Sequence, residues 1–164
     1  MQSFRRIGLL LALSATSITL SLAAVAADAV GDQIFTNSAD IKWGAAPPSV
    51  PKGAKIAVLN GDPGKAGPFV IRLMAPAGYK IPAHWHTQTE NLTVISGTFY
   101  LGSGDTMNPA HEHALKAGGY HYLPAKAHHY AFTKAPAVVQ INGDGPFDIN
   151  YINPADDPQK SAMK

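Results

Sequence analysis

The sequence contains no cysteine among its 164 residues. The protein therefore uses no disulfide bond, has no thiolate for catalysis or metal binding, and carries no lipid on an N-terminal cysteine. Charge of one sign is not in large excess either, since 13 Lys and Arg face 11 Asp and Glu without a basic patch. This balance argues against nucleic acid as a partner.

Helical patterning is also scarce. No segment beyond the first 27 residues shows a convincing apolar period of 3.6, and no internal repeat recurs at a fixed spacing. Instead, 13 prolines and 15 glycines separate short apolar runs, which is typical of short strands joined by tight turns. The length suits one domain, and the sequence predicts an all-β sandwich or barrel.

The first 27 residues differ from the rest. Residues 1–6 carry two arginines, residues 7–22 are apolar or small, and residues 24–28 offer small side chains for cleavage. This order predicts a cleavable signal peptide over 1–27, and hence a periplasmic or secreted protein with no stable membrane insertion after cleavage. The alternative is an uncleaved anchor, although the run is short against the roughly 20 residues of a membrane span. The Arg5-Arg6 pair leaves open the general secretory and twin-arginine routes.

The remaining chain divides into three predicted parts. Residues 28–54 form an N-terminal arm with short edge strands at 33–35 and 41–43, in which Trp43 packs onto the domain or a partner subunit. A β domain follows over 55–152, and a polar tail over 153–164. Strands are predicted at 55–59, 69–74, 98–101, 120–123, 130–132, 138–141 and 147–152.

The segment 78–97 carries the main chemical signal. Side chains of a strand alternate between its faces, so His84, His86 and Glu90 share one face, with Gln88, if the strand runs straight. Two imidazoles and a carboxylate on one wall supply most of the ligands of a divalent transition metal. All seven histidines fall between residues 84 and 129, so a closed fold allows a third imidazole to face the first two.

Two other features are interpreted as ordinary surface. The triplet His111-Glu112-His113 resembles a metal-binding spacing, but it lies beside loop residues without a bracketing pattern. Arg72, the only arginine after residue 27, is expected on a solvent face, the alternative being a clamp for a substrate carboxylate.

The residues of 78–97 and 118–133 resemble the two motifs of the cupin family. Every fixed position of the first motif is matched, by Gly78, His84, His86, Glu90 and Gly97. The second motif is matched in part, by Gly118, Pro124 and His129. Lys126 stands where the family usually has a glycine that permits positive φ, and Thr133 where it has asparagine.

The resemblance implies a jelly-roll β-barrel or sandwich with four metal ligands, His84, His86, Glu90 and His129. His128 is the rival for the fourth place, although strand alternation puts it on the opposite face from His129. Iron or manganese is the first expectation for the metal, with nickel, copper, cobalt or zinc as alternatives. Pocket-wall candidates, which core packing would explain equally well, are Gln88, Tyr100, Phe132 and Ile141.

The resemblance favours a metal-dependent oxidoreductase of the oxygenase or oxidase type, acting on a small organic acid or phenolic compound. In this interpretation Glu90 is the catalytic residue, moving between metal ligand and proton acceptor. Two alternatives stay open: a non-catalytic protein that binds metal or a small ligand, and an isomerase or lyase that needs no dioxygen. Uncovered edge strands and the resemblance also suggest a homodimer.

Overall fold

The computed structural model describes residues 33–161. The predicted signal peptide, residues 1–27, lies outside this range. Within it, no helix is both long enough and apolar enough to cross a membrane. The longest α-helix there, α1, runs only from Pro158 to Ser161.

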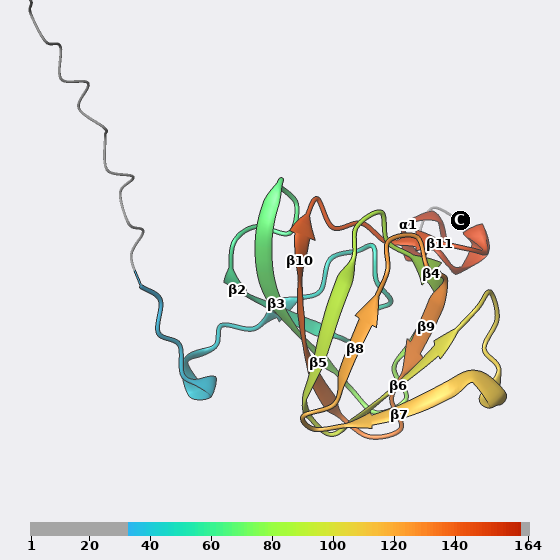
Figure 1. Ribbon diagram of the computed structural model, residues 1–164, viewed down its shortest axis with the longest axis horizontal. Coiled ribbons are helices and arrows are strands. Elements are labelled where there is room, and N and C mark those ends of the chain that lie inside the picture. The colour runs from blue at the N-terminus through green and yellow to red at the C-terminus, as the bar shows by residue number, and fades with distance from the viewer. Residues whose placement is uncertain (1–32, 162–164) are drawn as a thin grey trace, which may run out of the picture. The chain divides into compact units, whose positions relative to one another are not determined.

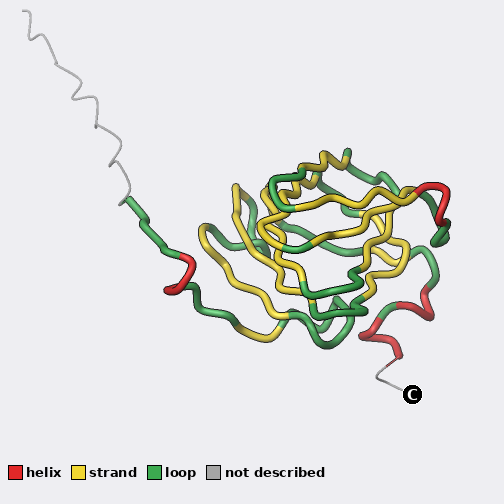
Figure 2. Tube along the Cα trace, turned by 90° about the horizontal axis from the view of Figure 1, so that it is seen from below, coloured by secondary structure: helices red, strands yellow, loops and turns green. Residues whose placement is uncertain are grey.

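Two antiparallel sheets face each other (Figures 1 and 2). The larger has the order β1-β2-β3-β10-β5-β8, and the smaller β11-β4-β9-β6-β7. The larger sheet contains β1 (Gly44–Ala45), β2 (Lys55–Asn60), β3 (Gly67–Ala75), β5 (Glu90–Ser96), β8 (Tyr120–Leu123) and β10 (Ala137–Gly145). The smaller contains β4 (Lys80–Trp85), β6 (Thr98–Ser103), β7 (Glu112–Lys116), β9 (His129–Phe132) and β11 (Asn150–Tyr151). Short 3-10 turns cover Ser38–Asp40, Pro109–His111 and Pro154–Asp156.

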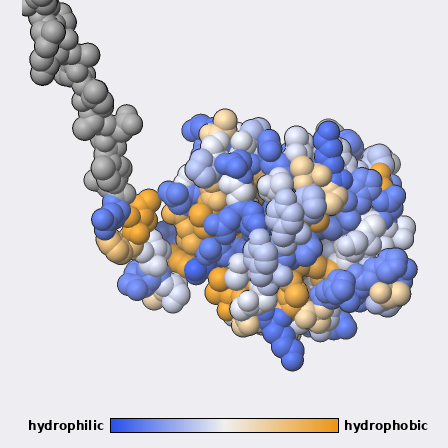
Figure 3. Space-filling model, in the orientation of Figure 1, coloured by the Kyte–Doolittle hydropathy of each residue, from blue (hydrophilic) through white to orange (hydrophobic). Residues whose placement is uncertain are grey.

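The core lies between the sheets. Alternate residues of β3 are buried and half-buried along the strand, which is the expected pattern for a strand with one face on the core. Phe69, Val94, Phe99 and Val139 are almost fully buried there. The face of the domain seen in Figure 3 is mixed, with hydrophilic residues interspersed among apolar ones. The predicted all-β architecture of two packed sheets is therefore confirmed.

Several predicted elements differ from the structure. The edge strands predicted at 33–35 and 41–43 are wrong, because both segments lack a ladder partner and Phe35 is 87% exposed. The arm contributes β1 instead, which pairs with β2. Strand β7 was not predicted, since its residues carry no alternating apolar pattern.

The C-terminal region also differs. The strand predicted over 147–152 is reduced to β11, because the carbonyl and carboxylate of Asp148 bond His86 and Thr87 rather than a neighbouring strand. The tail is ordered as a 3-10 turn and α1 up to Ser161. Asn153 caps the turn by accepting a hydrogen bond from Ala155 N.

Two tyrosines fasten the segment 47–51 to the sandwich. The hydroxyl of Tyr79 donates to the carbonyl of Pro51 at 2.7 Å, and that of Tyr151 to the carbonyl of Ser49 at 2.8 Å. Burial raises the pKa of Tyr79 to about 12. The N-terminal arm is thus held by hydroxyls that must stay protonated.

Alkaline pH is expected to weaken this attachment. In the unfolded chain tyrosine ionises near pH 10, whereas Tyr79 keeps its proton to about 12, so its stabilising contribution is complete below pH 10 and is lost between pH 10 and 12. Urea unfolding across this interval should show falling stability, and Tyr79→Phe should flatten the decline. The control is Tyr122→Phe, which removes an exposed tyrosine. An unchanged profile in Tyr79→Phe would contradict the assignment.

Lys126 takes the backbone conformation of the glycine that it replaces. Its φ is +64°, and it alone among the described non-glycine residues has a positive φ. Its backbone N–H donates to the carbonyl of His86 at 2.8 Å. The turn before β9 is therefore retained despite the substitution, and it ties that turn to the loop after β4.

Lys126→Gly is expected to stabilise the protein. A left-handed conformation costs a non-glycine residue about 1 kcal/mol, and the greater freedom of glycine in the unfolded chain offsets about half of that gain. Chemical denaturation should show a net increase of about 0.5 kcal/mol. Ala125→Gly, at an exposed neighbour with ordinary φ, should destabilise. A loss of stability in Lys126→Gly would mean that the lysine side chain has a structural role.

Candidate metal centre

Strand pairing brings the two most distant histidines together. On β4 and β9, His84 lies directly opposite His129. An irregularity in the ladder between Ile81 and His84 changes the alternation, so that neighbouring Ala83 and His84 are both buried. His84 is 2% and His129 3% exposed, so both imidazoles lie inside the sandwich.

His86 and Glu90 reach the same place through a turn, and not along a straight strand. Strand β4 ends at Trp85 and β5 begins at Glu90. Both His86 and Glu90 are buried, with 4% of each exposed. The prediction that Gln88 shares their face is wrong, because residues 86–89 form the turn and Gln88 does not line the cavity.

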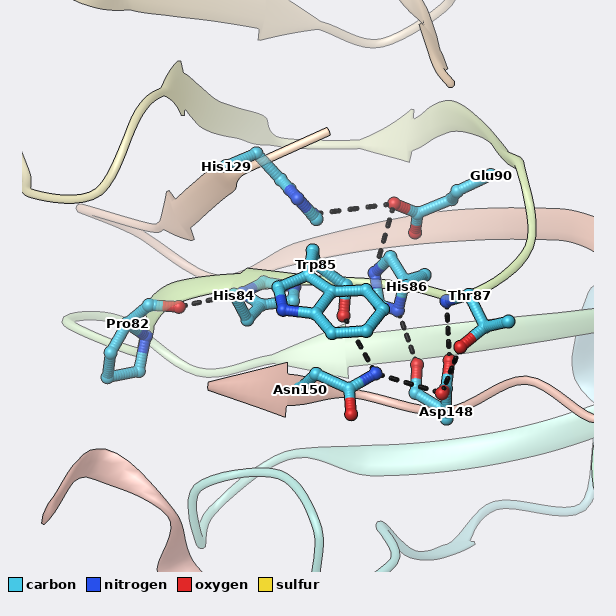
Figure 4. A network of polar contacts seen from close by, with 9 residues as sticks. All are labelled: Pro82, His84, Trp85, His86, Thr87, Glu90, His129, Asp148 and Asn150. Carbon is cyan, nitrogen blue, oxygen red and sulfur yellow. Dashed lines mark hydrogen bonds and ion pairs between the residues drawn. The ribbon is translucent and has the colours of Figure 1, made fainter. Parts of the chain in front are cut away.

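The four predicted side chains converge (Figure 4). Three histidines, His84, His86 and His129, each offer a ring nitrogen within 4.8 Å of the others. One carboxylate oxygen, Oε2 of Glu90, lies 3.6 Å from Nε2 of His86 and 3.6 Å from Nε2 of His129. The rings of His84 and His129 are 4.0 Å apart between centroids.

Backbone carbonyls fix two of the imidazoles. Nδ1 of His84 donates to the carbonyl of Pro82 at 2.7 Å, and Nδ1 of His86 donates to the carbonyl of Asp148 at 2.5 Å (Figure 4). With Nδ1 carrying the proton, Nε2 of each ring presents its lone pair. Such hydrogen bonds orient the histidine ligands of metal ions and raise their basicity.

Burial favours the uncharged forms of His84, His129 and Glu90. It lowers the pKa of His84 to about 3, helped by the neighbouring His86. It lowers the pKa of His129 to about 2, with His84 and His86 adding to the effect. Burial also raises the pKa of Glu90. Neutral imidazoles are the form that binds metal, and a cation among them would favour the ionised carboxylate.

The donor set fits a divalent transition metal. Three imidazole nitrogens and one carboxylate oxygen suit manganese, iron, cobalt, nickel, copper or zinc. Among residues 33–161, no lysine or arginine lies within ion-pair distance of Glu90. A bound cation would therefore supply the positive charge needed to compensate the buried carboxylate of Glu90.

Asp148 holds the turn between β4 and β5 in place. Its carboxylate accepts hydrogen bonds from the backbone N of Thr87 at 2.7 Å, from Oγ1 of Thr87 at 2.6 Å and from Nδ2 of Asn150 at 2.8 Å. Its own carbonyl receives Nδ1 of His86. Asp148 thus orients His86 through its carbonyl and holds Thr87 through its carboxylate.

Asp148→Ala is expected to weaken metal binding by about 10-fold, the lower end of the losses seen when groups that orient metal ligands are removed. Equilibrium dialysis with Mn²⁺ measures this directly. Asp144→Ala, at an exposed acid of β10, is the matched control and should leave affinity unchanged. Equal affinity in the two variants would show that the hydrogen bonds of the Asp148 carboxylate do not help to orient His86.

A cavity of about 280 Å³ opens onto the four side chains. Its wall is mainly apolar and comes from both sheets, the segment 47–50 and the segment 147–149. Apolar wall residues include Ile71, Leu73, Ile81, Leu92, Phe99, Leu101, Ile141, Phe147 and Ile149. The ring of Phe147 stacks on that of His86 with centroids 4.4 Å apart. The cavity is therefore apolar except where it meets the histidines, Glu90, Asp148 and Ser49.

The other candidate residues lie elsewhere. Of the predicted wall residues Ile141 lines the cavity, whereas Tyr100 and Phe132 stack on each other away from it, 4.7 Å between centroids. His128 is exposed and lies 2.6 Å from Asp105. Arg72 donates to Oε1 of Gln140 on the outer face of the larger sheet and does not reach the cavity.

Sequence reasoning missed Asp148 and Phe147. Both contact His86 from a segment about 60 residues further along the chain, and no spacing rule connects them to the first motif. The alternation of Phe147, Ile149 and Tyr151 was visible, but it predicted a strand and gave no sign that Asp148 would hold a turn.

Comparison with known proteins agrees with this architecture. The family described as a domain of unknown function (DUF4437) matches residues 26–150. No curated protein sequence matches the chain significantly.

Three solved structures with the same fold illustrate the similarity. The polyketide cyclase RemF from Streptomyces resistomycificus aligns with a TM-score of 0.65 and 14% identity, over 81% of this chain and 94% of its own. A putative acetylacetone dioxygenase from Methylibium petroleiphilum aligns with a TM-score of 0.61 and 19% identity, over 80% of this chain and 88% of its own. An RmlC-like cupin from Shewanella frigidimarina aligns with a TM-score of 0.54 and 14% identity, over 69% of this chain and 91% of its own. These similarities confirm the cupin fold.

Proposed function

Because the chain belongs to the DUF4437 family and has the fold of a cupin, we propose that it is a mononuclear metalloenzyme of the oxygenase or oxidase type. His84, His86, Glu90 and His129 would hold one divalent transition metal, with iron or manganese favoured. The observation that supports this most strongly is the convergence of three buried ring nitrogens, within 4.8 Å of one another, on an apolar cavity. Iron or manganese bound there would supply Lewis acidity and redox chemistry toward dioxygen and substrate.

The cavity favours a particular class of substrate. Its wall contains no lysine or arginine among the described residues, so no side chain there would neutralise a free carboxylate. A volume of about 280 Å³ exceeds the roughly 150 Å³ of a protein cavity that binds benzene. We therefore favour a small, mainly apolar molecule with one ionisable oxygen, such as a phenol or an enolisable ketone, over a multiply charged organic acid.

Within this proposal Glu90 handles the proton. A cation held by the imidazoles would favour its ionised form, and that carboxylate would be placed to accept the proton of a phenolic or enolic hydroxyl beside the three imidazoles. Phe147, stacked on His86, would cover the substrate ring and exclude water. The tyrosine-fastened segment 47–51 would close the cavity on the side of the N-terminal arm.

Oxygen uptake tests the proposal. Protein loaded with Fe²⁺ or Mn²⁺ is offered a panel of phenols and β-diketones, with dicarboxylic acids as charged comparisons. The proposal predicts oxygen consumption with members of the first group and little with the second. Consumption of substrate without oxygen would favour an isomerase or lyase, and binding without turnover under both metals would favour a ligand-binding protein. Either result would overturn the oxygenase assignment.

Two further proposals concern the protein's surroundings. We retain export through cleavage of the predicted signal peptide over 1–27, and a homodimer formed through uncovered sheet edges. Mass spectrometry of the exported protein would test the first, since an intact Met1 contradicts cleavage. Light scattering of the purified protein would test the second, since a monomer at micromolar concentration contradicts it.

A further inference from the structure

A second cavity, of about 320 Å³, lies where the last strands of the two sheets diverge. Strands β7 and β8 are joined by a tight turn and run away from it in different directions (Figure 1). The turn is attached to β5 by paired hydrogen bonds, in which Gly118 N donates to Val94 O and Val94 N to Gly119 O. The wall of this second cavity is formed by Leu101, Gly102, Ser103, His113, Leu115, Tyr120 and His121.

Strand alternation directs two imidazoles into this space. His113 shares its face of β7 with Leu115, which packs against the core. His121 shares its face of β8 with the buried Leu123, whereas Tyr120 and Tyr122 are exposed. Both histidines line the cavity, one from each sheet, and His113 is close enough to act on the pKa of His121.

His121 has an unused ring nitrogen. Its Nδ1 is buried and has no hydrogen-bond partner among the described residues. A buried polar atom without a partner costs about 1–3 kcal/mol, so a ligand for this nitrogen would stabilise the fold. The pKa of His121 is lowered by burial and by the nearby His113, which leaves the ring neutral and its lone pair available.

We propose that His113 and His121 form a second site, for a divalent transition metal that prefers imidazole ligands, such as Zn²⁺ or Cu²⁺. Imidazole suits these ions, and Oγ of Ser103 and water can complete the coordination. An anionic ligand fits less well, because no lysine or arginine within residues 33–161 lines the cavity. In this assignment His113 pairs with His121 across the sheets and not with His111, its neighbour in the sequence.

Zinc binding tests this site independently of the first. Equilibrium dialysis of the purified protein against Zn²⁺ should give two ions per chain, the second weaker than the first. His113→Ala should weaken the second site at least 10-fold and leave the first unchanged. His113 is exposed, so this variant is expected to fold. His111→Ala, which removes an exposed histidine two residues away that does not line the cavity, should change neither site.

Nuclear magnetic resonance of the imidazole nitrogens identifies the second ligand. Zn²⁺ added beyond the first equivalent should shift the ring signals of His121. The same shift should persist in His129→Ala, where the first site is disabled, so that failure at one site can be told from failure at the other. A single zinc per chain, an equal loss in His111→Ala and His113→Ala, or unshifted His121 signals would each overturn the proposal.

Discussion

Replacing His129 by alanine is expected to reduce metal affinity by at least about 100-fold, while replacing its neighbour His128 leaves affinity unchanged. Loss of a group that merely orients a ligand costs 10–100-fold, so loss of a proposed ligand should cost no less. The two residues are adjacent and chemically identical, but His129 is buried beside Glu90 and His128 is exposed beside Asp105. This pair therefore separates a specific ligand role from a general effect of removing an imidazole.

Inductively coupled plasma mass spectrometry after dialysis against limiting Mn²⁺ gives the comparison. His129→Gln is included because it keeps a polar side chain in the buried position, and circular dichroism of each variant checks that it is folded. If folded His129→Gln retains the affinity of the unmodified protein, His129 is not a ligand. If His128→Ala loses metal as His129→Ala does, the second motif has been assigned in the wrong register.

Removing the metal is expected to lower the melting temperature by about 10 °C. An ion present at 1,000 times its dissociation constant stabilises the folded state by about 4 kcal/mol, and each kcal/mol shifts the melting temperature of a chain of this size by about 2–4 °C. The physical cause is the buried Glu90, whose pKa burial raises and which has no lysine or arginine within ion-pair distance among residues 33–161.

Glu90→Gln separates the two contributions to this effect. Glutamine preserves the shape of the side chain without its charge, so metal should bind less tightly and chelation should lower the melting temperature by less than half as much. Differential scanning calorimetry with and without chelator measures both shifts. Equal shifts in the unmodified protein and Glu90→Gln would show that the carboxylate plays no part in binding.

The sequence was most informative where spacing and chemistry coincide. The interval between His84 and Glu90, bracketed by Gly78 and Gly97, indicated three of the four side chains that the structure brings together, and the second motif added His129. Both glycines have positive φ, and at Gly97 a Cβ would lie 2.5 Å from the carbonyl of Pro136. The glycines of the motif therefore reflect backbone geometry, while its histidines and glutamate supply the proposed metal ligands.

Other features depend on contacts between distant segments. The straight strand expected through Gln88 fails because four residues must turn to bring Glu90 back toward His86. Asp148 and the segment 47–51 are about 100 residues apart in the sequence but line the same cavity, and neither carries a local pattern that predicts its role. At Lys126 the local sequence disfavours the observed structure. Lysine is unfavourable at positive φ, but the residue adopts it because its backbone N–H bonds the carbonyl of His86.

Anomalous diffraction from crystals of the metal-loaded protein tests most directly whether three imidazoles and one acid hold a common ion. Data collected on both sides of the absorption edge of the bound metal place the ion without reference to the side chains. A strong peak is expected at about 2.0–2.2 Å from a nitrogen of each of His84, His86 and His129 and from an oxygen of Glu90. A loaded crystal with no peak between these four residues would contradict this expectation.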